Sequence, residues 1–173
     1  MPVVHVCPWA EVPRVAKRVR PSHLVSLLDP GDWPETPPEV APDRHHRVGV
    51  HDYAEPQDGA VVPEERHIRE LIGFLNGWDP AAPILIHCFA GISRSTATAL
   101  ITLALHNPGR EAEAARAIRA QSAIAQPNRR IVAIADRLLG LDGRLNQALA
   151  AMGPGRPSYV NQPFEVPLTL RAD

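Results

Sequence analysis

Short apolar runs alternate with segments of helical periodicity along most of the chain. Four apolar runs predict strands: 3–7, 24–28, 47–51 and 83–88. Apolar residues at a helical spacing predict five helices and a sixth candidate: 11–20, 62–78, 95–106, 110–122, 128–139 and, as the candidate, 141–151. Strands that alternate with helices and then give way to a helical half indicate an α/β fold. We expect a central, mostly parallel sheet of about four to five strands, flanked by helices.

Proline and glycine mark where this regular pattern stops. Residues 29–42 (DPGDWPETPPEVAP) are acidic and rich in proline, and they predict a loop because proline has no N–H to donate to a sheet or helix. From Gly153 onward the chain is again rich in proline and glycine, which predicts an extended tail on the surface. We therefore expect one folded domain at 1–152 and a C-terminal tail at 153–173.

Composition narrows the classes of protein to which the chain can belong. Its 173 residues suit a single domain, and a formal net charge of -1 gives no overall basic field, so we expect neither a nucleic-acid partner nor a membrane partner. No apolar stretch is long enough to span a bilayer, and the first residues do not resemble a secretory signal. Cys7 and Cys88 lie far apart in the sequence, which favours a reducing compartment over a disulfide framework. We expect a cytoplasmic protein.

The segment from His87 to Ser95 (HCFAGISRS) joins the strongest predicted strand to an apolar helix. Ligands bind at the C-terminal ends of parallel strands, and the free N–H groups at a helix N-terminus attract anions. We expect the following backbone N–H groups to form an anion cradle: Phe89, Ala90, Gly91, Ile92, Ser93 and Arg94. The planar side chain of Arg94 can hold two phosphate oxygens, and the positive surroundings favour the thiolate form of Cys88. Ser95 is placed to donate a hydrogen bond to the sulfur.

This string resembles the signature of the cysteine-dependent protein tyrosine phosphatases, written His-Cys, two residues, Gly, two residues, Arg, Ser/Thr, and every fixed position matches. The five residues between Cys88 and Arg94 separate it from rhodanese-like loops, which have four. The resemblance implies a dual-specificity-phosphatase-like fold over the domain at 1–152. It also implies Cys88 as nucleophile, His87 as a structural support of the loop, and a reaction that needs neither a metal nor an organic cofactor.

A phosphatase of this kind also needs a carboxylic acid that protonates the leaving group. In the small dual-specificity branch it lies on a loop upstream of the cysteine, where Asp52 and Asp58 are both candidates. Asp52 is the better match because it directly follows a predicted strand. Low-molecular-weight tyrosine phosphatases have the opposite order of cysteine and acid. Asn128, after Pro127, is similar to a Pro-Asn turn of this branch and is either a helix N-cap or a support for loops near the site.

The resemblance implies hydrolysis of phosphotyrosine, with some tolerance for phosphoserine and phosphothreonine, and a phosphorylated protein or small phosphate ester as partner. The loop carries no charged side chain before Arg94, which favours a phosphoprotein. The alternatives are a phosphatase for a non-protein ester (an RNA end, an inositol phosphate or a metabolite), a non-catalytic phosphate-binding module, and a sulfurtransferase. The sequence gives no indication of the oligomeric state.

Other residues have two interpretations each. Cys7 is either a buried strand residue, which we favour, or a partner that protects Cys88 as a disulfide. His45, His46 and His51 are close in sequence, but no matching acidic or cysteine ligands accompany them, so no metal site is predicted. Trp33 either forms a wall of the pocket or anchors the proline-rich loop.

Overall fold

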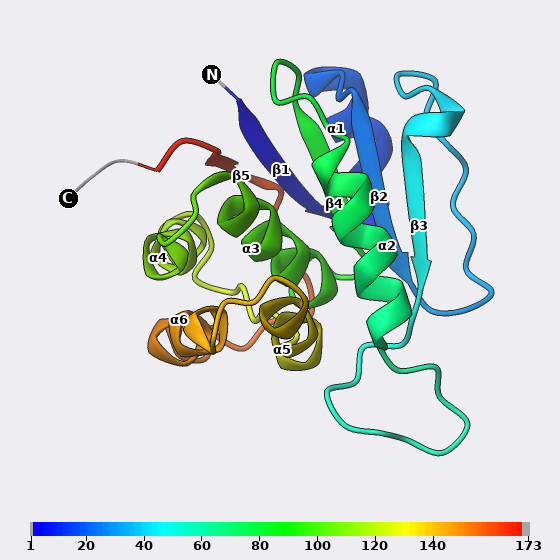
Figure 1. Ribbon diagram of the computed structural model, residues 1–173. Helices are drawn as coiled ribbons and strands as arrows, with labels where there is room; N and C mark the ends of the chain where they lie inside the picture. The colour runs from blue at the N-terminus through cyan, green and yellow to red at the C-terminus, as the bar shows by residue number, and fades with distance from the viewer. Residues whose placement is uncertain (1, 171–173) are drawn as a thin grey trace.

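A five-stranded sheet runs through the centre of the protein in the order β3-β2-β4-β1-β5 (Figure 1). The computed structural model describes residues 2–170. The strands are β1 (Val3–Pro8), β2 (His23–Leu28), β3 (His45–Gly49), β4 (Ile84–Cys88) and β5 (Phe164–Pro167). The first four are mutually parallel, and β5 pairs antiparallel with β1 at the edge. The predicted mostly parallel sheet is therefore confirmed.

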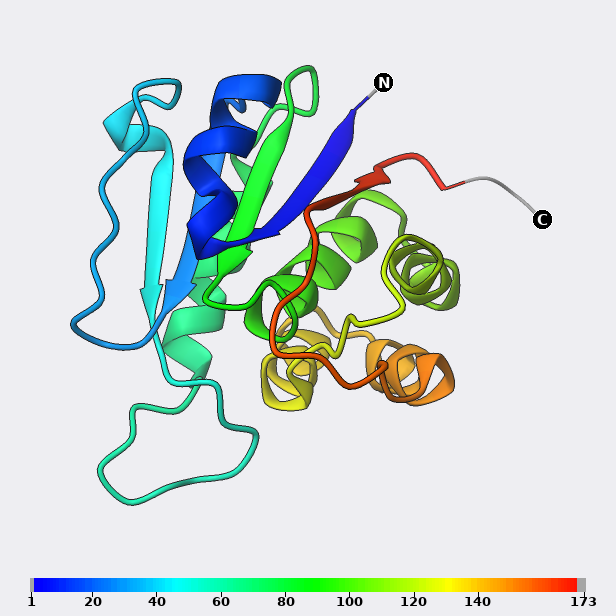
Figure 2. The same ribbon diagram turned by 180° about the vertical axis from the view of Figure 1, so that it is seen from behind.

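Helices cover both faces of this sheet. The short helix α1 lies on the face seen in Figure 2, while the longer helices α2 and α3 lie on the face seen in Figure 1. Helices α4 and α5 pack against α3, and α6 packs on α4 and α5. The helices are α1 (Val12–Val19), α2 (Glu65–Asn76), α3 (Arg94–His106), α4 (Glu111–Gln121), α5 (Arg129–Leu138) and α6 (Arg144–Met152). Two short 3-10 helices occupy Trp9–Glu11 and Pro42–Arg44. All six predicted helices are present with shifted ends, and no helix within residues 2–170 is long and apolar enough to cross a membrane.

Helix α3 is the central helix because it is covered on every side. All its residues from Arg94 to Ala104 are buried, between the sheet and helices α2, α4 and α5. Its threonine hydroxyls remain satisfied inside the core because they donate to carbonyls of the preceding turn, as Thr98 does to Arg94 and Thr102 to Thr98. The functional loop thus enters a helix that is rigidly held.

Two sequence predictions differ from the structure. Strand β3 begins at His45 rather than Arg47, because hydrogen bonds to Ser26 and Thr36 allow the polar His45 side chain to be buried beside the sheet. The predicted surface tail is wrong where the chain forms β5, whose residue Val166 is fully buried opposite Val4. A four-residue strand carries too little alternation to be recognised. Residues 171–173 of that tail lie outside the described residues.

Candidate active site

The loop between β4 and α3 has its carbonyl groups turned outward. Each carbonyl from Phe89 to Ser93 accepts a hydrogen bond from another part of the chain: Phe89 from Trp9 N (3.1 Å), Ala90 from Asn161 N (2.9 Å), Gly91 from Asn161 Nδ2 (2.9 Å), Ile92 from Gln126 N (2.9 Å) and Ser93 from Asn128 N (3.2 Å). The backbone N–H groups of residues 90–93 donate to no acceptor within residues 2–170. Such free, clustered N–H groups form an anion-binding nest.

Gly91 is required at the point where this loop lies against β1. Its φ of +70° is in the left-handed region. A Cβ atom there would lie 2.8 Å from the backbone nitrogen of Pro8 and 2.9 Å from the carbonyl carbon of Cys7. Glycine thus serves both the turn and the close approach of two backbones.

Arg94 is buried, and its side chain is held in one orientation. Its Nη1 donates to Asp29 Oδ1 (2.7 Å) and to the carbonyl oxygen of Val50 (2.6 Å). Its Nε is a buried nitrogen without a hydrogen-bond partner within the described residues. A buried donor without a partner is costly, so this nitrogen would gain from an anion bound beside it.

Cys88 is the last residue of β4, and it is almost fully buried, at 3% exposure. Its Sγ lies 3.1 Å from the Ser95 hydroxyl oxygen, in the first turn of α3. Strand, loop and helix therefore bring the predicted nucleophile and the predicted hydroxyl donor together.

Asp52 accepts two hydrogen bonds, one from the loop and one from the residue that precedes α5. Its Oδ1 accepts from the Ser93 hydroxyl (2.7 Å) and from Asn128 Nδ2 (2.8 Å). Asn128 also caps α5, since its Oδ1 accepts from the backbone N–H groups of Arg130 and Ile131. Both roles considered for Asn128 are thus present in one side chain. Both contacts reach the same oxygen of Asp52, which leaves Oδ2 available to other partners.

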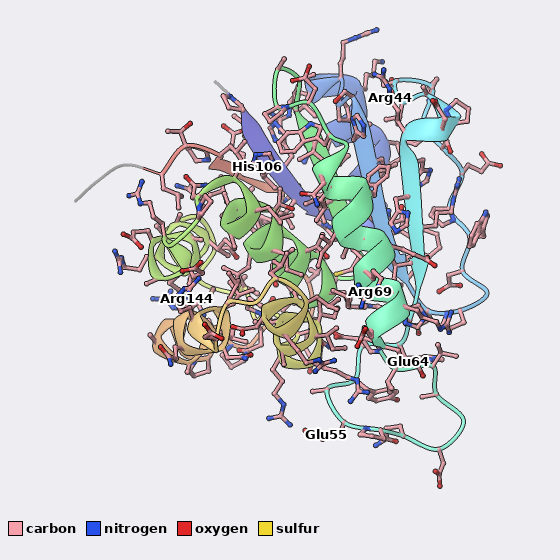
Figure 3. All side chains as sticks on the ribbon, viewed as in Figure 1. Arg44, Glu55, Glu64, Arg69, His106 and Arg144 are labelled. Carbon is pink, nitrogen blue, oxygen red and sulfur yellow. The ribbon has the colours of Figure 1, made fainter. Side chains whose placement is uncertain are left out.

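Asp58 is placed differently. It lies in the loop between β3 and α2, which projects from the body of the protein; Glu55 and Glu64, labelled in Figure 3, mark its course. Two hydrogen bonds between His51 and Val61 close the base of this loop. A cavity of about 330 Å³ beside the phosphate-binding loop is lined by Asp52, Phe89 and Arg94, among others, but not by Asp58.

His87 begins a buried hydrogen-bond chain that ends in the proline-rich loop. His87 Nδ1 lies 3.3 Å from the Cys88 carbonyl oxygen, and its Nε2 lies 2.5 Å from the Ser26 hydroxyl. The Ser26 hydroxyl lies 2.8 Å from His45 Nε2, and His45 Nδ1 lies 2.8 Å from the Thr36 hydroxyl, which accepts from Arg47 Nη2 (2.9 Å).

The Cys88 carbonyl at one end fixes the direction of every bond when both rings are neutral. A carbonyl can only accept, so a neutral His87 carries its proton on Nδ1 and accepts from Ser26, and a neutral His45 then carries its proton on Nε2. This arrangement requires both rings to be neutral. Burial agrees with this requirement, because it lowers the pKa of His87 to about 4 and, together with Arg47, lowers the pKa of His45 to about 3.

Three residues of the site were not identified from the sequence. Asp29, at the end of β2, holds Arg94; Asn161, from the C-terminal segment, holds the loop carbonyls; and Ser26 links the two histidines. Each lies far from Cys88 in the sequence. Figure 2 shows the C-terminal segment passing the end of the sheet on its way to β5. None of the three belongs to a local motif, so only the fold identifies them.

Cys7 lies apart from the reacting groups. Cys7 pairs with His87 across β1 and β4, so by strand alternation its side chain and that of Cys88 are on opposite faces of the sheet. It packs in the apolar cluster under α1, and burial raises its pKa to about 12. Within residues 2–170 no group of three or more His, Cys, Asp or Glu side chains is arranged to hold a metal.

Comparisons with known proteins agree with this geometry. The family model described as protein-tyrosine phosphatase matches residues 37–129. The structure of DUSP15 has a TM-score of 0.61 at 22% identity, covering 88% of this chain and 94% of that chain. Human tyrosine phosphatase-like serine/threonine/tyrosine-interacting protein gives 0.61 at 15% identity (82% and 94%), and PTPMT1 in complex with PI(5)P gives 0.56 at 14% (86% and 91%). No curated protein sequence matches. The expected dual-specificity-phosphatase-like fold is confirmed.

Proposed function

Because the chain belongs to the protein-tyrosine phosphatase family, we propose that it hydrolyses phosphotyrosine monoesters through a phosphocysteine intermediate on Cys88. The observation that carries the proposal is the set of free N–H groups at residues 90–93, together with the Nε of Arg94, which has no partner within the described residues. Hydrogen-bond donors fixed in advance around a transferring phosphoryl group lower the barrier, because they need no reorganisation during the reaction.

In the first step, the Cys88 thiolate attacks phosphorus. The Sγ–P bond forms, the bond from phosphorus to the tyrosine oxygen breaks, and protonated Asp52 gives its proton to that oxygen. The contacts of Asp52 support Oδ2 as the proton carrier, because Ser93 and Asn128 both donate to Oδ1. Arg94 and the loop N–H groups hold the three equatorial oxygens.

In the second step, water replaces the sulfur. The Asp52 carboxylate accepts a proton from water as the new P–O bond forms and the Sγ–P bond breaks. The Ser95 hydroxyl, 3.1 Å from Sγ, stabilises the departing thiolate. Inorganic phosphate leaves, and Cys88 and Asp52 return to their starting states.

The surroundings of the cavity support a phosphoprotein as substrate. Asp29, Asp32 and Asp52 line it beside Arg94. These acidic side chains disfavour a second phosphate next to the reacting one, as a polyphosphorylated inositol would bring. We propose phosphotyrosine as the preferred substrate, with phosphoserine and phosphothreonine as weaker ones. A free thiolate also requires a reducing compartment, and we propose the cytoplasm.

The test compares four proteins on phenyl phosphate, para-nitrophenyl phosphate and a phosphotyrosine peptide. Cys88→Ser should abolish turnover. Asp52→Asn should lower kcat by about 10²–10⁴-fold on the peptide, and by less on para-nitrophenyl phosphate, whose leaving group needs no proton. Asp58→Asn is the matched control and should retain the wild-type rate.

Three results would overturn parts of the proposal. Full activity of Cys88→Ser would remove the covalent mechanism. A large loss in Asp58→Asn, with Asp52→Asn unaffected, would exchange the roles of the two aspartates. Binding of the phosphopeptide without turnover by the wild-type protein would indicate a non-catalytic phosphate-binding module instead.

A further inference from the structure

A groove of about 840 Å³ opens beside the catalytic cavity, on the α1 side of the sheet. Its lining comes from Leu24 of β2 and His87 of β4, from Val12 at the start of α1, and from residues 34–39 of the proline-rich loop. Five of the lining residues are prolines, which have no N–H to offer. The groove therefore provides apolar contact and few hydrogen bonds.

This groove shares a wall with the catalytic cavity. Phe89 lines both, is 64% exposed, and meets Trp9 edge-on at 6.5 Å between ring centroids. At the same end lie Tyr159 and Val160, which are 100% and 49% exposed. Clustered exposed apolar side chains beside a binding site indicate a surface that a ligand covers.

We propose that the groove is a subsite for an apolar side chain next to the phosphotyrosine of a peptide substrate. The inference rests on the proposed function, since it places the reacting phosphate over Cys88. Phe89 then separates the phosphotyrosine ring from the neighbouring side chain. Tyr159, whose side chain is fully exposed in the free protein, packs over that apolar side chain when the peptide binds.

Charge favours a peptide over a lipid as the occupant. Glu35 and Glu39 line the groove beside a single basic residue, Lys17, and Asp29 and Asp32 line the adjoining cavity. Anionic bilayers attract clusters of basic side chains, and this rim is mainly acidic. An apolar groove with an acidic rim suits a peptide that carries an apolar residue and no further phosphate.

The test uses a series of phosphotyrosine peptides in which one leucine occupies each flanking position in turn, in a serine and glycine background. For each enzyme, the readout is the ratio of kcat/KM for the leucine peptide to that for the serine peptide, which cancels general effects on the site. The wild-type ratio should reach on the order of tenfold at one position. It should fall toward one in the Tyr159→Ser, Val160→Ser double variant. The matched control Trp33→Ser should keep it, because Trp33 is an exposed aromatic residue outside the groove.

A second measurement separates this inference from the proposed function. It is the ratio of the Kd of the serine peptide to the Kd of the leucine peptide, both measured on the Cys88→Ser variant. A leucine preference in Kd without wild-type turnover would sink the proposed function and leave the groove assignment intact. Ratios near one at every position, in both kcat/KM and Kd, would overturn the groove assignment. Faster hydrolysis of PI(5)P in vesicles than of any peptide, reduced in the double variant, would also overturn it, because the occupant would then be a lipid chain.

Discussion

Replacing Ser26 with alanine removes the middle of the buried hydrogen-bond chain behind Cys88. In the native protein the Ser26 hydroxyl donates to His87 Nε2 and accepts from His45 Nε2. Ser26, His45 and His87 are all buried, so water does not replace the lost hydroxyl. The variant leaves one ring nitrogen without a donor and one ring N–H without an acceptor.

The magnitude follows from these two groups. Each buried polar group without a partner costs about 1–3 kcal/mol, so the free energy of unfolding should fall by about 2–6 kcal/mol. This loss is a large part of the free energy of unfolding of a typical domain, which is about 5–15 kcal/mol. Activity should also fall, because His87 then no longer has a fixed tautomer facing the Cys88 carbonyl.

Urea denaturation, with the midpoint and the m-value fitted together, measures the loss. Ser22→Ala is the matched control, since Ser22 also bonds a histidine, His23, but at a half-buried position that water can reach. The control should lose no more than about 0.5 kcal/mol. If Ser26→Ala loses no more than Ser22→Ala, the chain of bonds does not stabilise the site as described here.

Gly91→Ala should lower kcat/KM on the order of a hundredfold, because its Cβ meets the backbone of β1; Gly109→Ala, also at positive φ but with open space around it, should keep the wild-type rate in the same assay. Asn161→Ala should weaken binding of inorganic phosphate roughly tenfold by calorimetry, and unchanged binding would contradict its support of the loop. The lowered pKa values of His45 and His87 mean that, below their ordinary value of 6.5, the unfolded chain binds protons that the native protein does not. The free energy of unfolding, measured by urea denaturation, should therefore be level above about pH 7 and fall by up to about 1.4 kcal/mol per pH unit for each histidine as the pH drops from 6.5 toward 4. A free energy of unfolding that rises in acid would contradict this.

The parts of the fold and of the site that the sequence predicts are those set by neighbouring residues in the chain. The run from β4 through the loop into α3 is continuous in the chain, so apolar pattern, glycine and arginine all point to one arrangement. Cys88, Ser95 and the phosphate-binding loop came from this segment. The helices were also predicted, because each carries its own periodicity.

Long-range partners could not be predicted in the same way. Asp29 and Asn161 look like ordinary loop residues in the sequence, and only the sheet order brings them to Arg94 and Gly91. The sequence favours Asp52 over Asp58 as the acid only because Asp52 directly follows a predicted strand. The contacts of Asp52 with Ser93 and Asn128 come from the packing of α5, which no local pattern contains.

The hydrogen bond from Asn161 to Gly91 has a consequence for the order in which parts of the protein fold during synthesis. The two residues are 70 positions apart, so strand β4 and helix α3 are synthesised long before the Gly91 carbonyl can be satisfied. On the ribosome, the central strands and α3 can associate first, while the loop waits for the C-terminal segment. At about 5–20 residues per second, synthesis of the intervening chain takes seconds, which is far longer than a helix takes to form. The phosphate-binding loop should therefore be among the last parts of the protein to reach its native form.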